Sequence, residues 1–452
     1  MRKVRFNAFG SHSKLICIIL IVLVGFLPQY GCYDAVEVDE EVYTLAIGVD
    51  KGSSGMIRMT FQYASYKEGG GGKSAGSSES GGGGAGSSSD DTGEVDGTIV
   101  TTVESPTLLE GINLLNASAN RQVSLMHAKM LVFSEEYARE GIQKYIDPLV
   151  RFREAREFMR VVVCQGKAED FIRENKTLIG TSASKGIDLM FEQSKMTGYY
   201  PDVFFTDFYT SLLTPYGQAT AVYAGVNDFN HFGEDKDHTM LPATPKTSYE
   251  PGMIPRKGGT KKELFGTAVF DGDKMVGSLD QHQTRFYLMT IGEFRTGNFT
   301  LEDPDKPGYF IVIQCRLIEK PKIKARMQNG LPVIELELKL DSNIISIQSR
   351  IHHENQQDIA AIEKLIQDYF TQGIQDTIQT TQKKWNTDIF YFGKKVAGNF
   401  MTIPDFEQYN WLAHYRDAVI KTNVSVKLFG SGSIYQASPI RSSTSIQGEK
   451  NE

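Results

Sequence analysis

The most regular alternation of apolar and polar residues lies in the last third of the chain. Asn329 with Gly330, inside this stretch, is the dipeptide that most strongly favours a tight hairpin turn. The alternation predicts strands at Tyr309–Leu317, Lys322–Met327, Leu331–Leu340, Ile344–Ile351 and Ala418–Leu428. Apolar residues at steps of three and four predict one helix over Gln356–Trp385, roughly 45 Å long. We therefore expect a C-terminal antiparallel sheet that has one solvent-exposed face and is covered by a long helix on the other.

Strand and helix patterns intermix in the first part of the chain. Strands are predicted at Tyr43–Asp50, Met56–Tyr63, Thr98–Val103, His127–Phe133 and Met159–Cys164. Ser105 and Pro106 have the chemistry of a helix start and predict a helix that ends near residue 119. Ser134 is expected to cap a second helix, and a third is predicted at Ala168–Asn175. The mixture, without a regular strand–helix–strand repeat, indicates an α+β fold.

The middle of the chain has a weaker pattern. It predicts helices at Ile187–Met196, Phe204–Leu213 and Gln281–Met289, a long loop at 227–259, and a hairpin over Leu264–Phe270 and Lys274–Leu279. The expected organisation is multi-domain: a leader at 1–31, an N-terminal α+β domain at 32–175, a middle domain at 176–295, a C-terminal α+β domain at 296–430 and a disordered tail at 431–452. The Gly- and Ser-rich tract at 67–93 cannot bury apolar surface, so we expect a disordered insertion there.

The N-terminus has the features of an export signal. Basic residues without any acidic ones precede the apolar run Leu15–Leu27. A membrane span needs about 18 to 20 apolar residues, so a signal peptide is favoured over its alternative, a transmembrane helix. Gly31 followed by Cys32 resembles the junction at which bacterial lipoproteins are cleaved and acylated, although such signals usually have Leu where this chain has Gln29. We therefore expect diacylglycerol and an N-acyl chain on Cys32, and attachment to the lipid bilayer through them.

Composition and charge narrow the range of partners. Hydrophobic residues make up 40% of the chain, which is enough to build globular cores. The net charge of -7 and the sequence pI near 5.7 exclude nucleic acid as the main partner, because binding to phosphates needs a basic face. Apolar, strand-like neighbours predict that Cys164 and Cys315 are buried thiols. The sequence leaves open whether the two cysteines form a disulfide.

The candidate chemical motifs have ordinary explanations. Residues 72–76 spell a nucleophile elbow, but the tract has no strand or helix to flank it. Residues 72–74 spell the end of a phosphate loop, but Lys67 stands where that loop requires a glycine. His352 and His353 would point to opposite faces of a strand, so a solvated loop is favoured over a metal site. His127 is expected to be a packing residue of a strand. An aromatic cluster follows the long helix and is expected to be core rather than a partner-binding surface: Trp385, Phe390, Tyr391 and Phe392.

Several blocks keep their order and spacing over nearly the whole mature chain. They are Leu45–Asp50, His127–Lys129 with Glu135–Ile142, Gly266–Phe270 with Asp273–Asp280, and Lys383–Phe390. Together they resemble the Ger(x)C family, the lipoprotein C subunits of spore germinant receptors in endospore-forming bacteria. The chain departs from the family at Tyr33–Asp34, where members often have Trp-Asp, and in the length of its glycine tract at 69–93.

The resemblance implies a three-domain α+β lipoprotein, anchored through Cys32 at the outer, extracytoplasmic face of the inner spore membrane. It implies membrane-embedded receptor subunits as partners and a role in the response to small nutrient germinants, without catalysis and without a cofactor beyond the lipid. The alternative function is a lipid-anchored solute-binding protein that captures a small germinant itself, which needs a closed pocket between two similar lobes. An extracellular hydrolase is a third possibility, for which the sequence shows no nucleophile, base or metal set.

Overall fold

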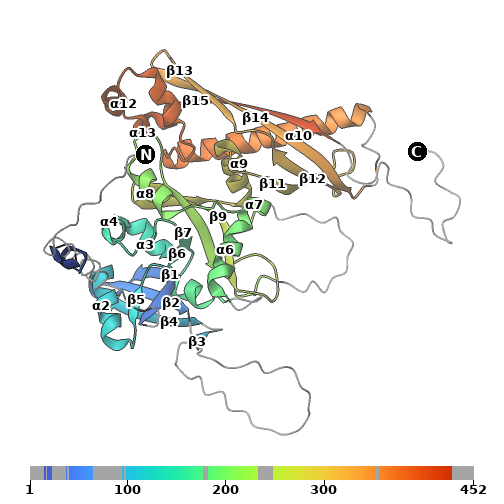
Figure 1. The fold of residues 1–452 in the computed structure, drawn as a ribbon. Coiled ribbons are helices and arrows are strands. Elements are labelled where there is room, and N and C mark those ends of the chain that lie inside the picture. The colour runs from blue at the N-terminus through green and yellow to red at the C-terminus, as the bar shows by residue number, and fades with distance from the viewer. Residues whose placement is uncertain are drawn as a thin grey trace, which may run out of the picture.

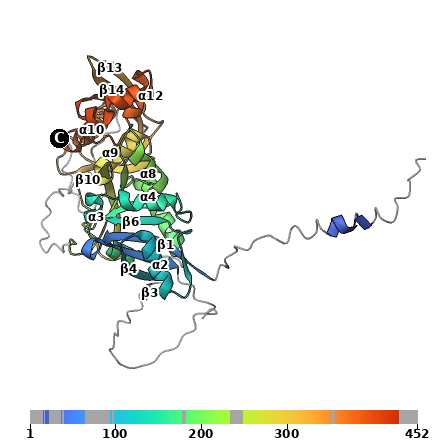
Figure 2. The ribbon, with the colours of Figure 1, turned by 90° about the vertical axis from the view of Figure 1, so that its left-hand side faces the viewer.

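The computed structural model describes residues 15–16, 18–22, 37, 40–64, 94–95, 98–176, 182–232, 248–349, 351 and 356–429 (Figure 1). Gly31, Cys32, the tract at 67–93, the pair His352–His353 and the tail at 431–452 lie outside these residues. Among the residues described, no helix has the length and apolar character needed to cross a membrane. Two β-sheets follow each other along the long axis of the molecule (Figures 1 and 2).

The first sheet has ten strands in the described part of the chain, in the order β10-β9-β8-β7-β6-β1-β2-β4-β3, with β5 beside β1. Their bounds are β1 Glu41–Lys51, β2 Ile57–Ala64, β3 Glu94–Val95, β4 Thr98–Ser105, β5 Gln122–Ser124, β6 Met130–Ser134, β7 Arg160–Cys164, β8 Thr220–Val226, β9 Lys262–Asp271 and β10 Lys274–Leu279. β1, β6, β7 and β8 run parallel, and the strands at the two sides of this group, β2 beside β1 and β9 beside β8, pair antiparallel. Because β8 to β10 extend the sheet beyond β7, residues on both sides of position 175 share one sheet.

Helices cover both faces of the first sheet. They are α2 Leu108–Ser118, α3 Glu135–Glu140, α4 Gln143–Arg151, α5 Ala168–Arg173, α6 Ala183–Glu192 and α8 Phe205–Leu213. The short α7 (Ser194–Thr197) follows α6 and contacts the second sheet instead. In β6, Leu131 and Phe133 share a buried cluster with α2, α3, α4 and α8, whereas Met130 and Val132 share one with α5 and α6. Burial on both faces explains why the central strands are apolar at nearly every position.

The second sheet carries the long helix that the sequence predicts. It consists of β11 Thr296–Glu302, β12 Phe310–Leu317, β13 Lys322–Gln328, β14 Leu331–Ile347 and β15 Val419–Leu428. The strands pair antiparallel except β15, which runs parallel to β14. α10 (Gln356–Thr380) lays Ile366, Phe370 and Ile374 on this sheet and continues into a π-helical turn, Thr381–Trp385. The predicted sheet with its covering helix is confirmed.

α9 (Gln281–Ile291) connects the two sheets. It packs against β9 of the first sheet and against α10 of the second. The Asp280 side chain accepts the Gln283 N–H at 2.8 Å, and the Gln283 side chain accepts the Asp280 N–H at 3.2 Å, which is a capping box. Three short helices then follow the π-helical turn: α11 Gly393–Val396, α12 Ile403–Tyr409 and α13 Trp411–His414.

The structure moves one predicted helix start and divides another predicted helix into two. Ser105 is the last residue of β4, and its hydroxyl donates to the Thr107 carbonyl at 2.6 Å; Thr107 is the residue that caps α2. Ser134 precedes α3 without a capping side-chain bond, and the helix expected after it is divided into α3 and α4. The division occurs at Gly141, whose φ of 122° is outside the helical region.

Three further differences concern strands. His127 lies in an exposed turn before β6 and not within the strand, with its ring edge-on to Tyr43 at 4.5 Å between centroids. The strands predicted at 331–340 and 344–351 are one strand, β14, and β11 was not predicted at all. The predicted burial of the thiols is confirmed: Cys164 and Cys315 are buried and free, so they do not pair.

Candidate functional site

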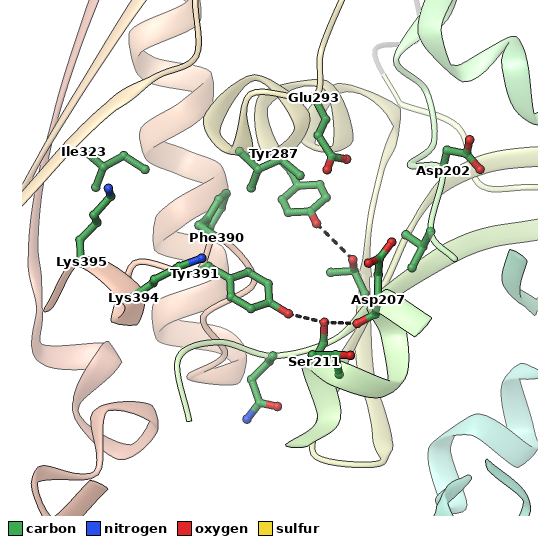
Figure 3. Close-up of a pocket in the computed structure, with 15 residues that line it drawn as sticks. Asp202, Asp207, Ser211, Tyr287, Glu293, Ile323, Phe390, Tyr391, Lys394 and Lys395 are labelled. Atoms are coloured by element: carbon green, nitrogen blue, oxygen red, sulfur yellow. Dashed lines mark hydrogen bonds between the residues drawn. The ribbon is translucent and has the colours of Figure 1, made fainter. Parts of the chain in front are cut away.

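A pocket of about 480 Å³ lies where the first sheet meets the C-terminal unit (Figure 3). One side is built from α8, the residues before it and the start of β8. The other side is built from the segment after the π-helical turn, and α9 with its exit closes the space between them. The labelled lining residues are Asp202, Asp207, Ser211, Tyr287, Glu293, Ile323, Phe390, Tyr391, Lys394 and Lys395.

A buried carboxylate shapes the C-terminal side of the pocket. Asp388 is fully buried, and its two oxygens accept the N–H groups of Phe390 (3.0 Å) and Gly393 (3.0 Å) and the indole N–H of Trp411 (2.8 Å). These bonds hold the tight turn from which Tyr391 and α11 project. Burial raises the pKa of Asp388 to about 6, because the surrounding protein solvates the charge less well than water does.

The same turn is joined to the first sheet. The Gln218 N–H donates to the Asp388 carbonyl at 2.7 Å, and the Gln218 side chain bonds the β9–β10 turn through Asp271 (2.9 Å) and Gly272 (3.0 Å). A Cβ at Gly217 would lie 2.9 Å from the Tyr391 ring, closer than side chains approach each other. The absence of a side chain at this glycine therefore lets the two units meet.

Tyr391 bridges the pocket. Its φ of 60° places it in the left-handed region, which is uncommon for a residue other than glycine and occurs at sites where the surrounding structure enforces it. Its hydroxyl donates to Ser211, and the Ser211 hydroxyl donates to the Asp207 carbonyl at 2.5 Å. Burial raises the pKa of Tyr391, so the phenol keeps its proton for this bond. The chain of bonds connects the C-terminal unit to α8.

The charged residues of the pocket are separated by sign, with lysines on one side and carboxylates on the other. Figure 3 shows Lys394 and Lys395 on the C-terminal side and Asp202 and Asp207 opposite them. Asp202 is paired with Arg160 at 3.1 Å. Burial raises the pKa of Glu293, and the nearby Asp207 and Asp202 carboxylates raise it further. The charge of Lys320 acts in the opposite direction and lowers the pKa of the same carboxyl.

The structure places the residues singled out from the sequence in different parts of the molecule or leaves them outside the described residues. Gly31, Cys32 and the pair His352–His353 lie outside the described residues, and His127 lies in an exposed turn with its ring against Tyr43. In the aromatic cluster, Phe390 and Phe392 are buried in the core as predicted. Tyr391 instead faces the pocket.

Sequence reasoning missed the pocket residues. The acidic ones lie on unremarkable helical and loop positions, and the lysine pair at 394 and 395 resembles any solvated surface pair. The only available signal was the aromatic run beside these lysines. In the described residues, no group of three or more His, Cys, Asp or Glu side chains is placed to hold a metal ion.

The comparisons with known proteins cover both sides of this pocket. The family described as spore germination protein N-terminal domain matches residues 34–226, and the family described as spore germination B3/GerAC like, C-terminal, matches residues 265–432. The chain belongs to the GerAC-like spore germination family. The resemblance to the Ger(x)C family is therefore confirmed, and the pocket takes residues from both family regions.

Individual relatives are distant in sequence. The chain is 22% identical to the spore germination protein YfkR of Bacillus subtilis (strain 168) over 429 residues, which cover 93% of this chain and 96% of the relative. It also resembles a solved structure, the crystal structure of the GerBC protein, with 13% identity and a TM-score of 0.49. That match covers 85% of this chain and 96% of the solved one.

Proposed function

We propose that this protein is the C subunit of a spore nutrient germinant receptor, held by lipid on Cys32 at the extracytoplasmic face of the inner spore membrane. It acts by contact with membrane-embedded receptor subunits and performs no catalysis. The observation that carries the proposal is the succession of the two GerAC-like regions along one chain, over 34–226 and 265–432. The cysteine that resembles a lipoprotein junction lies directly before the first region.

The anchor places the first sheet near the bilayer. Glu41, where β1 begins, is nine residues after Cys32, and a stretch of this length spans at most about 30 Å when fully extended. Two or three acyl chains on one residue exceed the two signals that stable membrane attachment requires. The β1–β5 region is therefore held within about 30 Å of the membrane surface, where membrane-embedded subunits are within reach.

The lipid is tested by mass spectrometry of the N-terminal peptide from membrane-fraction protein. We expect a peptide that begins at Cys32 and carries the acyl mass, and its loss in Cys32→Ala. Cys17→Ala, which changes a cysteine of the leader away from the junction, is the matched control and should keep the modification. Membrane-bound protein with an unmodified Cys32 would refute the anchor.

The receptor role is tested separately, with spores and with isolated membranes. We expect the protein to co-purify with tagged membrane subunits of one receptor, and Cys32→Ala spores to respond poorly to the nutrients which that receptor senses. A full nutrient response from spores that lack the protein, with no sister receptor to cover the loss, would end the proposal.

A second candidate, the tethered solute-binding protein, is favoured by one observation, the pocket of Figure 3. The two similar lobes that this alternative requires are not what the described residues form, because a ten-stranded mixed sheet faces a five-stranded one.

A further inference from the structure

The edge of the first sheet that lies nearest to Cys32 along the chain is formed by the starts of parallel strands. β1, β6 and β7 run parallel in neighbouring positions, so all three begin at one edge (Figure 1). The chain reaches this edge at Glu41, nine residues after Cys32. We call it the amino edge: the start of β1 together with residues 121–129 and 152–159, which precede β6 and β7.

Contacts between neighbouring elements join the amino edge into one surface. The His127 ring lies edge-on to Tyr43 of β1, with 4.5 Å between the ring centroids. The Leu125 N–H donates to the Glu154 carboxylate at 3.3 Å, which links the turn before β6 to the turn before β7. Both turns are therefore held in place beside the start of β1.

Two large apolar side chains of the amino edge are left to solvent. Phe158 is 70% exposed and Met126 is 41% exposed. The Phe158 ring is held edge-on to Phe204, with 6.2 Å between the centroids, so it projects from a defined position. Neighbouring strands lie about 4.8 Å apart and β6 alone separates β7 from β1, which places Phe158 about 10 Å sideways from β1.

The charged residues of the amino edge have both signs. Arg121, Arg153 and Arg156 are exposed, and none of them forms an ion pair with a described residue. Glu40 and Glu157 are exposed as well, so the edge has no large excess of positive charge. Arginine can bind a lipid phosphate through two parallel hydrogen bonds while the carboxylates stay in water. Attraction to anionic lipids in particular is therefore not expected.

We propose that the amino edge rests on the lipid bilayer, with Phe158 and Met126 among the head groups and the three arginines at the phosphates. The proposal rests on the proposed lipid anchor, because Cys32 brings this edge to within about 30 Å of the bilayer. The bilayer is the occupant because the chain leading from this edge ends in it, and because exposed aromatic rings are favoured at its interface. Docking fixes the orientation of the protein, which the linking residues alone leave free.

The experiment measures how deeply the amino edge enters the membrane. Full-length Phe158→Trp protein from the membrane fraction is reconstituted into phosphatidylcholine vesicles, with or without bromine on the acyl chains as a fluorescence quencher. We expect brominated lipid to lower the fluorescence of the added tryptophan about twofold, because interfacial aromatic rings lie at the boundary of the acyl region. Met401→Trp, at a position 98% exposed before α12 of the second unit, is the matched control and should not be quenched.

Two further comparisons test the assigned contacts. Arg153→Glu with Arg156→Glu should reduce the quenching of the tryptophan in Phe158→Trp, because carboxylates are repelled by lipid phosphates. Lys421→Glu with Lys427→Glu, which changes two exposed lysines of β15, is the control and should leave it unchanged. Addition of phosphatidylglycerol should change the quenching less than about twofold. Quenching that appears only with this anionic lipid would overturn the insertion of Phe158.

The outcomes separate this docking from the anchor. Absence of quenching in Phe158→Trp, or equal quenching in Met401→Trp, overturns the docking if the protein carries the acyl mass and floats with the vesicles. Protein that lacks the acyl mass and does not float refutes the anchor, and the docking with it. Thermal unfolding close to the parent's shows that a variant is folded, and Met126→Trp provides a second reporter on the same edge if Phe158→Trp is destabilised.

Discussion

Asp388 offers the sharpest test of how the C-terminal unit is stabilised. Its carboxylate is fully buried and accepts hydrogen bonds from Phe390, Gly393 and Trp411 at 2.8 to 3.0 Å. The loss of hydration on burial outweighs these hydrogen bonds, which lower the pKa, and raises the pKa of Asp388 from 3.8 to about 6. We predict that Asp388→Asn changes the pH dependence of stability in a direction that the sign of this shift determines.

The magnitude follows from linkage. A folded-state pKa above the unfolded one means that the native protein binds the proton more tightly, so the stabilisation from Asp388 is present at low pH and is lost as pH rises from about 4 through 6. A shift of about two pKa units corresponds to about 3 kcal/mol. Asn does not titrate. The stability of Asp388→Asn relative to the parent should therefore improve by about 2 to 3 kcal/mol between pH 4 and pH 7.

The local cost of the substitution does not affect this comparison. The Asn amide group must face either the Phe390 N–H or the donors of Gly393 and Trp411, which costs about 1 to 3 kcal/mol for each donor left without an acceptor. Asparagine carries that cost at every pH, so it cancels in the difference between the two pH values.

The assay is denaturant unfolding of parent and variant at both pH values, followed by tryptophan fluorescence. Trp411 donates its indole N–H to Asp388, and Trp385, the other tryptophan of the chain, is three residues before Asp388, so the signal reports on this region. A stability difference that is the same at pH 4 and pH 7, or that grows with pH in favour of the parent, would show that the buried carboxylate is better solvated by its donors than we infer.

Two further predictions concern packing and burial. A Cβ at Gly277 would lie 2.3 Å from the Trp385 ring, so Gly277→Ala should lower the free energy of unfolding by about 1 to 3 kcal/mol. Gly398 has open space around it, so Gly398→Ala should change the free energy of unfolding little. Equal effects of the two substitutions in denaturant unfolding would contradict the close approach of Gly277 to Trp385. Burial raises the pKa of Cys315 to about 12 and raises that of Cys164 as well, so neither thiol should be alkylated by iodoacetamide in the native protein near pH 8, and both should be alkylated after unfolding. Peptide mapping locates the modified cysteines, and rapid labelling of either one in native protein would refute the burial.

Local patterns predicted most of the individual elements correctly. The β9–β10 hairpin, the long α10 and β15 follow from the spacing of apolar residues, because that spacing is set by the geometry of a single helix or strand. The boundaries failed where a tertiary partner intervened. Ser105 continues β4 by pairing with Ile57 of β2 and so cannot cap a helix.

The order of the strands in each sheet could not be predicted from local sequence patterns, because strand pairing joins residues that are far apart in the chain. The spacing of apolar residues in β8 to β10 does not show that these strands continue the sheet begun by β1, and β11 is rich in polar residues. Strand pairing depends on which apolar faces remain to be covered once the helices are in place.

The pocket is the extreme case of this dependence. Along the chain, residues 388–395 read as one aromatic and basic stretch after a long helix. In the fold, buried Asp388 turns the backbone so that Phe390 and Phe392 enter the core while Tyr391 meets Ser211 of α8. Family membership could be read from the order of the sequence blocks, but the opposed charges of the pocket come together only when the two units pack.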